Sequence, residues 1–179
     1  SIAPMLTSLP NLNELSLVGN QIADLSPLVS ELARLSSLTA LNLRDNQISD
    51  VSPLTSLSNL TKLDLGGNKI TDISALTSLT NLTSLSLREN QLSDITPLAS
   101  LTKLTHLDLA KTQTSNISVL ASLTNLTELD LSSNKISDIS PLISLTNLTK
   151  LNLGGNPLSA DSRDVYLPQL RERRVQITW

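Results

Sequence analysis

Hydrophobic and polar residues alternate along this chain in one unit that recurs about every 22 residues. Each unit begins Leu-x-x-Leu-x-Leu, as in Leu60, Leu63 and Leu65, and polar residues alternate with the last two leucines. Alternation with a period of two predicts a short strand that buries one face. Strands that recur without a hairpin between them must run parallel and join by crossovers. A fixed period of this length indicates a solenoid of stacked repeats.

An asparagine follows each predicted strand and marks the period. Thr112 stands at the one position of this series that lacks an asparagine, and Asn20 precedes Asn46 by 26 residues instead of 22. The regular positions are Asn46, Asn68, Asn90, Asn134 and Asn156. We expect these amides to satisfy backbone groups of their own and the neighbouring turn, in a ladder. The loss of the amide at Thr112 predicts local softening or a small kink.

A short helix is predicted after each asparagine from the recurring Ile-x-Asp-Ile-Ser-Pro-Leu. A Ser or Thr before proline predicts a hydroxyl cap and proline at the first helical position, in one or two α or 3₁₀ turns. The pairs are Ser26-Pro27, Ser52-Pro53, Thr96-Pro97 and Ser140-Pro141. We interpret the Asp of this motif as a turn and helix-start residue. Four extra residues between Leu28 and Leu35 predict one additional helical turn in the first repeat.

The composition restricts which residue types can form the core and which classes of partner are expected. The chain has no Phe, one Met, one Trp and one Tyr, so its core must consist of Leu, Ile and Val. A formal net charge of −3 without clustered Lys and Arg argues against a nucleic-acid partner. The absence of cysteine excludes disulfides and thiolate metal sites. No apolar run is long enough to span a bilayer, so we expect no membrane insertion.

The pattern Leu-x-x-Leu-x-Leu-x-x-Asn-x-Ile, over roughly residues 12 to 158, resembles the leucine-rich repeat family. Its length and the repeated Asn-x-Ile-x-Asp-Ile-Ser-Pro-Leu are similar to the bacterial, internalin-like class. The resemblance implies an α/β solenoid, curved and right-handed, with a parallel β-sheet on the concave face and short α- or 3₁₀-helices on the convex face. It implies a protein partner of unknown identity, no cofactor and no enzymatic activity. The location in a bacterium stays open between the cell exterior, the cell surface and the cytoplasm.

We divide the chain into about seven leucine-rich repeats over residues 1–158 and a C-terminal cap of helix and strand over residues 159–179. Ile2-Ala-Pro4 resembles a descending leg, so the chain starts within a repeat, and dimerisation through this uncapped end is one candidate interaction. In the cap, we expect a helix that begins at Ser159 or Ser162 and is split or kinked by Pro168. Arg174 stands where relatives carry Gly, which puts the tight turn there in doubt.

Polar positions around the last two leucines of each strand should face the concave side in three columns. The predicted partner-binding residues lie in these columns: Arg44, Asp64, Arg88, His106, Asp108, Glu128 and Asp130. Arg44 and Arg88 flank Gly66, whose missing side chain predicts a shallow dip between two anchors. The predicted function is protein–protein interaction on this face. The alternative is a structural or regulatory repeat segment of a larger protein whose activity lies outside this chain.

Two groupings on this face resemble chemical sites. Ser84, His106 and Asp108 are the residue types of a nucleophilic triad. An open sheet uses its N–H groups in the strand ladder and offers no oxyanion hole, so we expect no catalytic residue. Asp108 beside Asp130 has two interpretations. The pair is either a site for a cation or a partner's basic group, or a like-charge pair that solvent screens. With only two carboxylates, we expect no resident metal.

Overall fold

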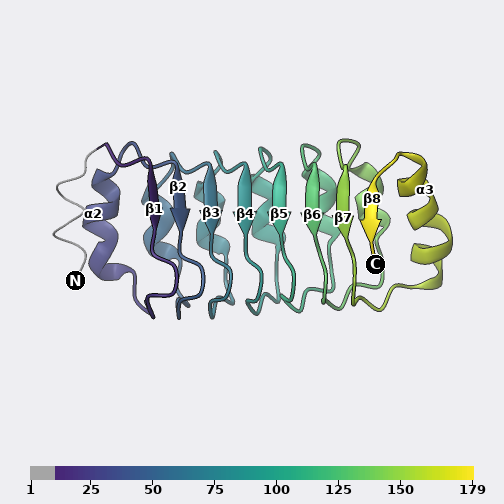
Figure 1. Ribbon diagram of the computed structural model, residues 1–179, viewed down its shortest axis with the longest axis horizontal. Coiled ribbons are helices and arrows are strands. Elements are labelled where there is room, and N and C mark those ends of the chain that lie inside the picture. The colour runs from purple at the N-terminus through teal and green to yellow at the C-terminus, as the bar shows by residue number, and fades with distance from the viewer. Residues whose placement is uncertain (1–10) are drawn as a thin grey trace.

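Short parallel strands form one continuous sheet that runs the length of the molecule. The computed structural model describes residues 11–179. Eight strands follow one another in chain order, as Figure 1 shows from purple to yellow. They are β1 (Glu14–Ser16), β2 (Ala40–Asn42), β3 (Lys62–Asp64), β4 (Ser84–Ser86), β5 (His106–Asp108), β6 (Glu128–Asp130), β7 (Lys150–Asn152) and β8 (Gln176–Thr178). The predicted leg at Ile2–Pro4, and the dimer surface that depends on it, lie outside the described residues.

The strands pair in the register that the repeat predicts. Leu41 lies beside Leu63, and Leu63 beside Leu85, so each strand places its central leucine in one line. These leucines are 2% exposed, because the alternation of side chains turns them into the core. The polar residues before and after each leucine therefore lie on the opposite side of the sheet, which is the concave face of the solenoid.

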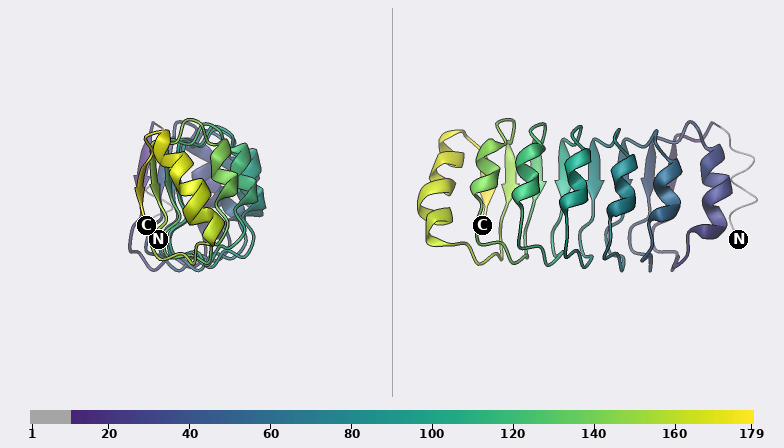
Figure 2. Two further views of the ribbon diagram at one scale, coloured as in Figure 1. Left: turned by 90° about the vertical axis from the view of Figure 1, so that its right-hand side faces the viewer. Right: turned by 180° about the vertical axis from the view of Figure 1, so that it is seen from behind.

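A row of short helices covers the other side of the sheet, as Figure 2 shows from behind. Most are single 3₁₀ segments: η1 (Ser26–Leu28), η2 (Ser52–Ser56), η3 (Ser74–Ser78), η4 (Thr96–Ser100), η5 (Ser118–Ser122) and η6 (Ser140–Ser144). In the first repeat, η1 continues into α2 (Val29–Arg34), so the four inserted residues form the expected helical turn. Between the helices and the sheet, Leu, Ile and Val stack in buried rows such as Leu54, Leu76, Leu98, Leu120 and Leu142, each at most 1% exposed.

The predicted hydroxyl caps of these helices are wrong, because an aspartate supplies the cap. Asp50 Oδ1 accepts the backbone N–H of Ser52 at 2.8 Å, two residues further on. The Ser52 hydroxyl donates to the same carboxylate and bonds to no free helix N–H. The same Asx turn recurs at Asp24, Asp72, Asp94 and Asp138. An aspartate accepts a nearby N–H readily in a turn, which leaves Ser free to begin the 3₁₀ segment.

The asparagine ladder is confirmed. Asn90 Oδ1 accepts the N–H of Ile70 from the preceding repeat at 2.9 Å. Its Nδ2 donates to the carbonyls of Leu65 and Leu87, at 3.0 and 2.9 Å, which belong to two successive repeats. The side chain is 2% exposed, so these backbone groups have no water to replace the amide. Each ladder asparagine thus joins one repeat to the next.

The repeat of Thr112 replaces the amide with a different set of bonds. The Thr112 hydroxyl donates to Leu109 O at 2.8 Å and lies 2.9 Å from the hydroxyl of Thr114. The Thr112 carbonyl accepts the N–H of Leu92, and Gln113 adopts a left-handed φ of 66°. The strands on both sides keep their register. The expected kink is therefore confined to the backbone of this turn.

The C-terminal segment covers the last layer of the stack, as the end view in Figure 2 shows. Ser159 Oγ accepts the N–H of Ser162, so Ser159 is the cap. The helix then forms the π-helical turn η7 (Ser162–Tyr166) and α3 (Leu167–Glu172). Pro168 lies in the first turn of α3, directly after the π-helical turn, and the backbone stays helical from η7 into α3, so the predicted split is a change of helix type instead of a break. Arg174 forms the tight turn despite its side chain, with a left-handed φ of 63°.

Replacing Asn90 with Ala should lower the free energy of unfolding by about 2–4 kcal/mol, because it leaves a buried N–H and buried carbonyls with fewer partners. Asn147→Ala is the matched control. Asn147 makes one exposed bond, from Nδ2 to Thr124 O, and should cost less than about 1 kcal/mol. Urea denaturation of the three proteins gives both differences, and equal losses would contradict a special role for the buried ladder.

Replacing Arg174 with Gly should stabilise the protein by about 0.5–1 kcal/mol, because glycine adopts a positive φ without the strain of a Cβ. The turn is a Schellman motif, in which Val175 N donates to Leu170 O and Arg174 N donates to Arg171 O. Gln169→Gly, inside α3, should instead destabilise by about 1 kcal/mol. Thermal melts distinguish the two, and a loss of stability in Arg174→Gly would show that the arginine side chain itself supports the cap.

Candidate functional site

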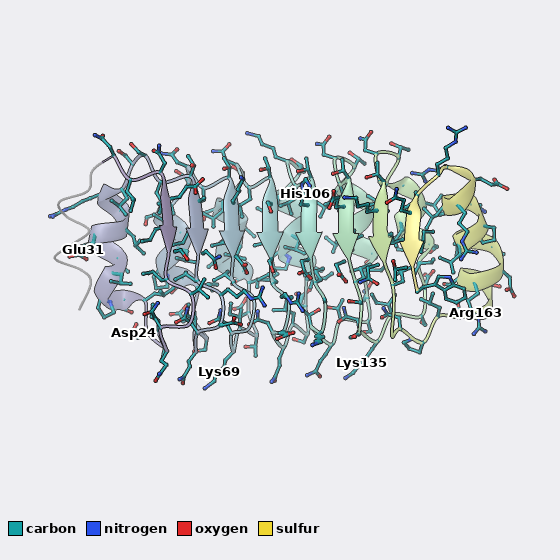
Figure 3. All side chains as sticks on the ribbon, viewed as in Figure 1. Asp24, Glu31, Lys69, His106, Lys135 and Arg163 are labelled. Atoms are coloured by element: carbon teal, nitrogen blue, oxygen red, sulfur yellow. The ribbon has the colours of Figure 1, made fainter. Side chains whose placement is uncertain are left out.

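All seven predicted partner-binding residues lie on the concave face or at its edge, as the strand register places them. His106 and Glu128 belong to the column before the central leucines, and Figure 3 shows His106 on the sheet face at β5. The middle column, after the central leucines, contains Asp64, Asp108 and Asp130. Arg44 and Arg88 lie in the third column, two residues further along the chain.

The middle column is built from Asx turns, which changes the interpretation of its carboxylates. Asp108 Oδ1 accepts the N–H of Ala110 at 2.9 Å, and Asp130 Oδ1 accepts the N–H of Ser132 at 2.8 Å. Asn42 and Asn152 make the same bond in their repeats. Aspartate at this position therefore has a structural reason, and the like-charge pair is not by itself evidence of binding.

The negative charge of Asp108 is nonetheless poorly compensated. Partial burial raises the pKa of Asp108 above its usual value, and the neighbouring charge of Asp130 adds to the shift. The N–H of Ala110 and the guanidinium of Arg88 act in the opposite direction. The nearest cationic contact, from Arg88 Nη1 to Asp108 Oδ2, is 4.0 Å. The ionised form of this carboxyl is thus disfavoured in the folded protein.

The predicted dip at Gly66 is wrong, because the stem of Arg88 fills it. A Cβ placed at Gly66 would lie 2.8 Å from Arg88 Cγ. The Arg88 guanidinium reaches Glu89 at 3.2 Å, and this hydrogen bond is the main reason that the pKa of Arg88 is raised. Arg44 does not meet Arg88, since Arg44 Nε lies 3.3 Å from the adjacent Asp45. The two arginines therefore form separate ion pairs, with no dip between them.

Three charged residues at the edge of this face were not predicted from the sequence. Asp45, Glu89 and Lys111 precede the ladder position in their repeats and have left-handed backbones with φ of 55–57°. Glu89 accepts hydrogen bonds from both Lys111 and Arg88, and these lower its pKa. The sequence did contain a signal for these residues, because the equivalent position in other repeats is glycine, as at Gly67. Glycine at this position indicates that the backbone has a positive φ. In repeats where the residue is not glycine, the same backbone conformation fixes the direction of its side chain.

The first column is linked by charges, and it contains no triad. Lys150 Nζ lies 2.7 Å from Glu128 Oε1, and the bond from Lys150 lowers the pKa of Glu128. His106 Nε2 lies 3.8 Å from the same Glu128 oxygen, while His106 Nδ1 is 2.8 Å from the hydroxyl of Thr105. Both ring nitrogens of His106 thus face groups other than Ser84.

Two shallow hollows lie side by side on the concave face. The C-terminal hollow, of about 390 Å³, extends over β4–β8 and is lined by His106, Asp108, Glu128, Asp130 and Lys150, among others. The N-terminal hollow, of about 540 Å³, extends over β1–β4. Ser84 and Ser86 border both, so small side chains lie where the two hollows meet.

Two further properties concern the described part of the chain. Within residues 11–179, no group of three or more His, Asp or Glu side chains is placed to hold a metal ion. No helix in this range has the length and apolar character needed to cross a membrane.

Comparison with known proteins identifies similar sequences and structures. A family model described as "Leucine Rich repeats (2 copies)" matches residues 36–78, 80–122 and 124–166. The fold is similar to that of an internalin, InlF, from Listeria monocytogenes, with a TM-score of 0.72 and 32% identity over 97% of this chain and 55% of that one. This chain therefore spans about half the length of that internalin.

Two other solved structures are similar along most of this chain. Internalin C2 of Listeria monocytogenes matches with a TM-score of 0.66 and 33% identity, over 90% of this chain and 80% of that one. A repeat protein of Leptospira interrogans matches with a TM-score of 0.77 and 26% identity, over 89% of this chain and 40% of that one. No curated protein gives a significant match.

Replacing Asp108 with Asn should raise stability at neutral pH by about 0.5 kcal/mol, because it removes a poorly compensated charge and keeps the Asx turn. The folded-state pKa of Asp108 lies above the usual 3.8, so its favourable contribution is complete below that pH and is lost as the pH rises through the folded-state pKa. The gain in the Asn variant should therefore appear only above about pH 3.8.

Asp64→Asn is the control for this measurement, because the column neighbours of Asp64 are the neutral Asn42 and Ser86. It should change stability little at any pH. Denaturation from pH 3 to pH 8 gives both profiles. A gain for Asp108→Asn that is equally large at pH 3 would mean that charge is not its cause.

Proposed function

Because the chain belongs to the leucine-rich repeat family and carries internalin-like repeats, we propose that it binds a protein partner on the concave face of its sheet. Members of this family typically bind proteins. The observation that carries the proposal is the contrast between the scaffold and this face. Leucines and ladder asparagines repeat almost unchanged, whereas the concave columns differ from repeat to repeat. A surface that varies on a constant frame is suited to recognition.

The composition of the face favours a polar and salt-sensitive interface. Both aromatic residues of the chain, Tyr166 and Trp179, lie in the C-terminal segment, so the face lacks the side chains that most often dominate binding energy. Arg44, Asp64, Arg88, His106, Asp108, Glu128 and Asp130 offer charge instead. Interactions between such exposed groups weaken as ionic strength rises.

A catalytic role is not part of this proposal. Ser84 makes no hydrogen bond to His106 in the described structure, and the backbone N–H groups of β4 and β5 lie in the strand ladder. Hydrolysis by a serine nucleophile requires a base in reach and free donors for an oxyanion.

The second candidate function is that of a structural or regulatory repeat segment within a larger protein. The observation that favours it is the coverage of InlF, since this chain spans only 55% of that protein. In this case the concave face would hold no partner of its own. A photo-reactive amino acid at Ser84 on the concave face, compared with one at Ala99 in η4 on the convex face, separates the two functions. Cross-links from Ser84 alone support binding on the concave face.

Replacing Ser86 with Tyr should weaken partner binding at least about tenfold, because a bulky side chain at the centre of the face obstructs both hollows. Ala99→Tyr, on the exposed side of η4, carries the same added side chain and should leave binding unchanged. Cross-linking yield and pull-down with each variant measure the effect, and circular dichroism confirms that both fold. Equal binding by the two variants would remove the concave face as the site.

A further inference from the structure

The acidic residues of the concave face between β2 and β7 form two groups. Those in the first column and at the edge are already paired with cations of this chain. The pairs are Arg44–Asp45 at 3.3 Å, Lys111–Glu89 at 2.9 Å and Lys150–Glu128 at 2.7 Å. The carboxylates of the middle column are different, because each bonds chiefly to backbone, and the one ion pair they make among residues 11–179 is the 4.0 Å contact of Arg88 with Asp108. The uncompensated charge of the face is therefore concentrated along its centre line.

Asp108 and Asp130 are the only neighbouring pair of carboxylates on this line, directly opposite each other in β5 and β6. Each uses Oδ1 in its Asx turn. Asp130 Oδ2 accepts one bond, from Asn152 Nδ2 at 3.0 Å. Asp108 Oδ2 has only the 4.0 Å contact with Arg88, whose guanidinium lies closer to Glu89. Both carboxylates thus retain capacity to accept hydrogen bonds from a cation.

The shape of the face leaves this pair open to a long side chain. Asp108 and Asp130 lie in the C-terminal hollow, which the small Ser84 and Ser86 border on one side. Lys150, which also lines the hollow, is held by Glu128 in the neighbouring column. A group that enters from a partner therefore meets the two carboxylates with only Arg88 of this chain near them, at 4.0 Å from Asp108 Oδ2.

We propose that the C-terminal hollow receives an arginine side chain of the protein partner, placed between Asp108 and Asp130. Neighbouring strands lie about 4.8 Å apart, and a planar guanidinium presents several N–H donors that can reach carboxylates on both. A metal ion is the weaker fit, because Ca²⁺ takes 6–8 oxygen ligands and the described residues bring only two carboxylates together. The inference rests on the proposed function and specifies what the partner must present there.

A model peptide tests this chemistry without knowledge of the partner. Acetyl-Gly-Arg-Gly-amide, titrated into ¹⁵N-labelled protein, should shift the amide signals of β5 and β6. The same peptide with neutral citrulline in place of arginine should not. The double variant Asp108→Asn/Asp130→Asn should bind at least about tenfold more weakly, and its turns should survive because Asn42 and Asn152 close the same turns.

Glu14→Gln/Asp45→Asn is the matched control, since it removes two negative charges from the same face and its edge and leaves Arg88 and its partner Glu89 unchanged. It should bind the arginine peptide as the unmodified protein does. Equal weakening in both double variants would show general attraction and overturn the proposal. Binding of citrulline, or calcium chloride shifting the same signals at a lower concentration than the peptide, would overturn it as well.

Failure of this inference can be told apart from failure of the proposed function. Loss of partner binding in Ser86→Tyr, together with no response to the arginine peptide, leaves the concave face as the site and removes only the arginine. Cross-links from Ala99 instead of Ser84 would remove the proposed function whatever the peptide does.

Discussion

The structure depends on the need to satisfy backbone groups that are buried where each strand turns outward. The ladder asparagines meet this need with one amide that contacts two repeats at once. Because the donor and acceptor must recur at the same place in each repeat, the ladder supports the period and the strand register, which the backbone bonds of the strands maintain at Thr112. Leucines alone would tolerate sliding of one repeat along the next, since apolar contacts have little directionality. The polar ladder adds the directional constraint, and the concave columns are aligned as its consequence.

Several residues on the concave face both stabilise the repeat and are available to contact a partner. Asp108 and Asp130 each close a turn with one oxygen and leave the other toward the concave side. Arg88 covers Gly66 with its stem and presents its guanidinium to Glu89 and Asp108. Substitution of such residues changes folding and binding together. Within residues 11–179, the side chains of Ser84, Ser86 and Lys62 make no hydrogen bond to the scaffold, so these are better positions at which to separate the two effects.

The fold and the columns of the face could be predicted because they follow from spacing. A period of 22 residues places His106 beside Ser84 and Asp108 beside Asp130 whatever the details of the turns. The directions of long side chains could not be predicted this way. The spacing predicted that Arg44 and Arg88 both lie beside Gly66. In the structure, each arginine forms an ion pair with the acidic residue that follows it in the chain. The helix caps were misassigned for a related reason, because Asp50 and Ser52 both suit a cap and only geometry distinguishes them.

The turn at Thr112 has a consequence for cooperativity. In a solenoid each repeat contacts only its neighbours, so stability behaves as a sum of terms along one dimension. Between the repeats of Asn90 and Thr112, one backbone bond from Leu92 replaces the side-chain amide that joins the other repeats. We expect this contact to be the boundary between two folding units. Ser84 and Arg88 lie on one side of it and Asp108 and Asp130 on the other, so a partner that spans the centre of the face would also hold the two units together and raise the cooperativity of unfolding.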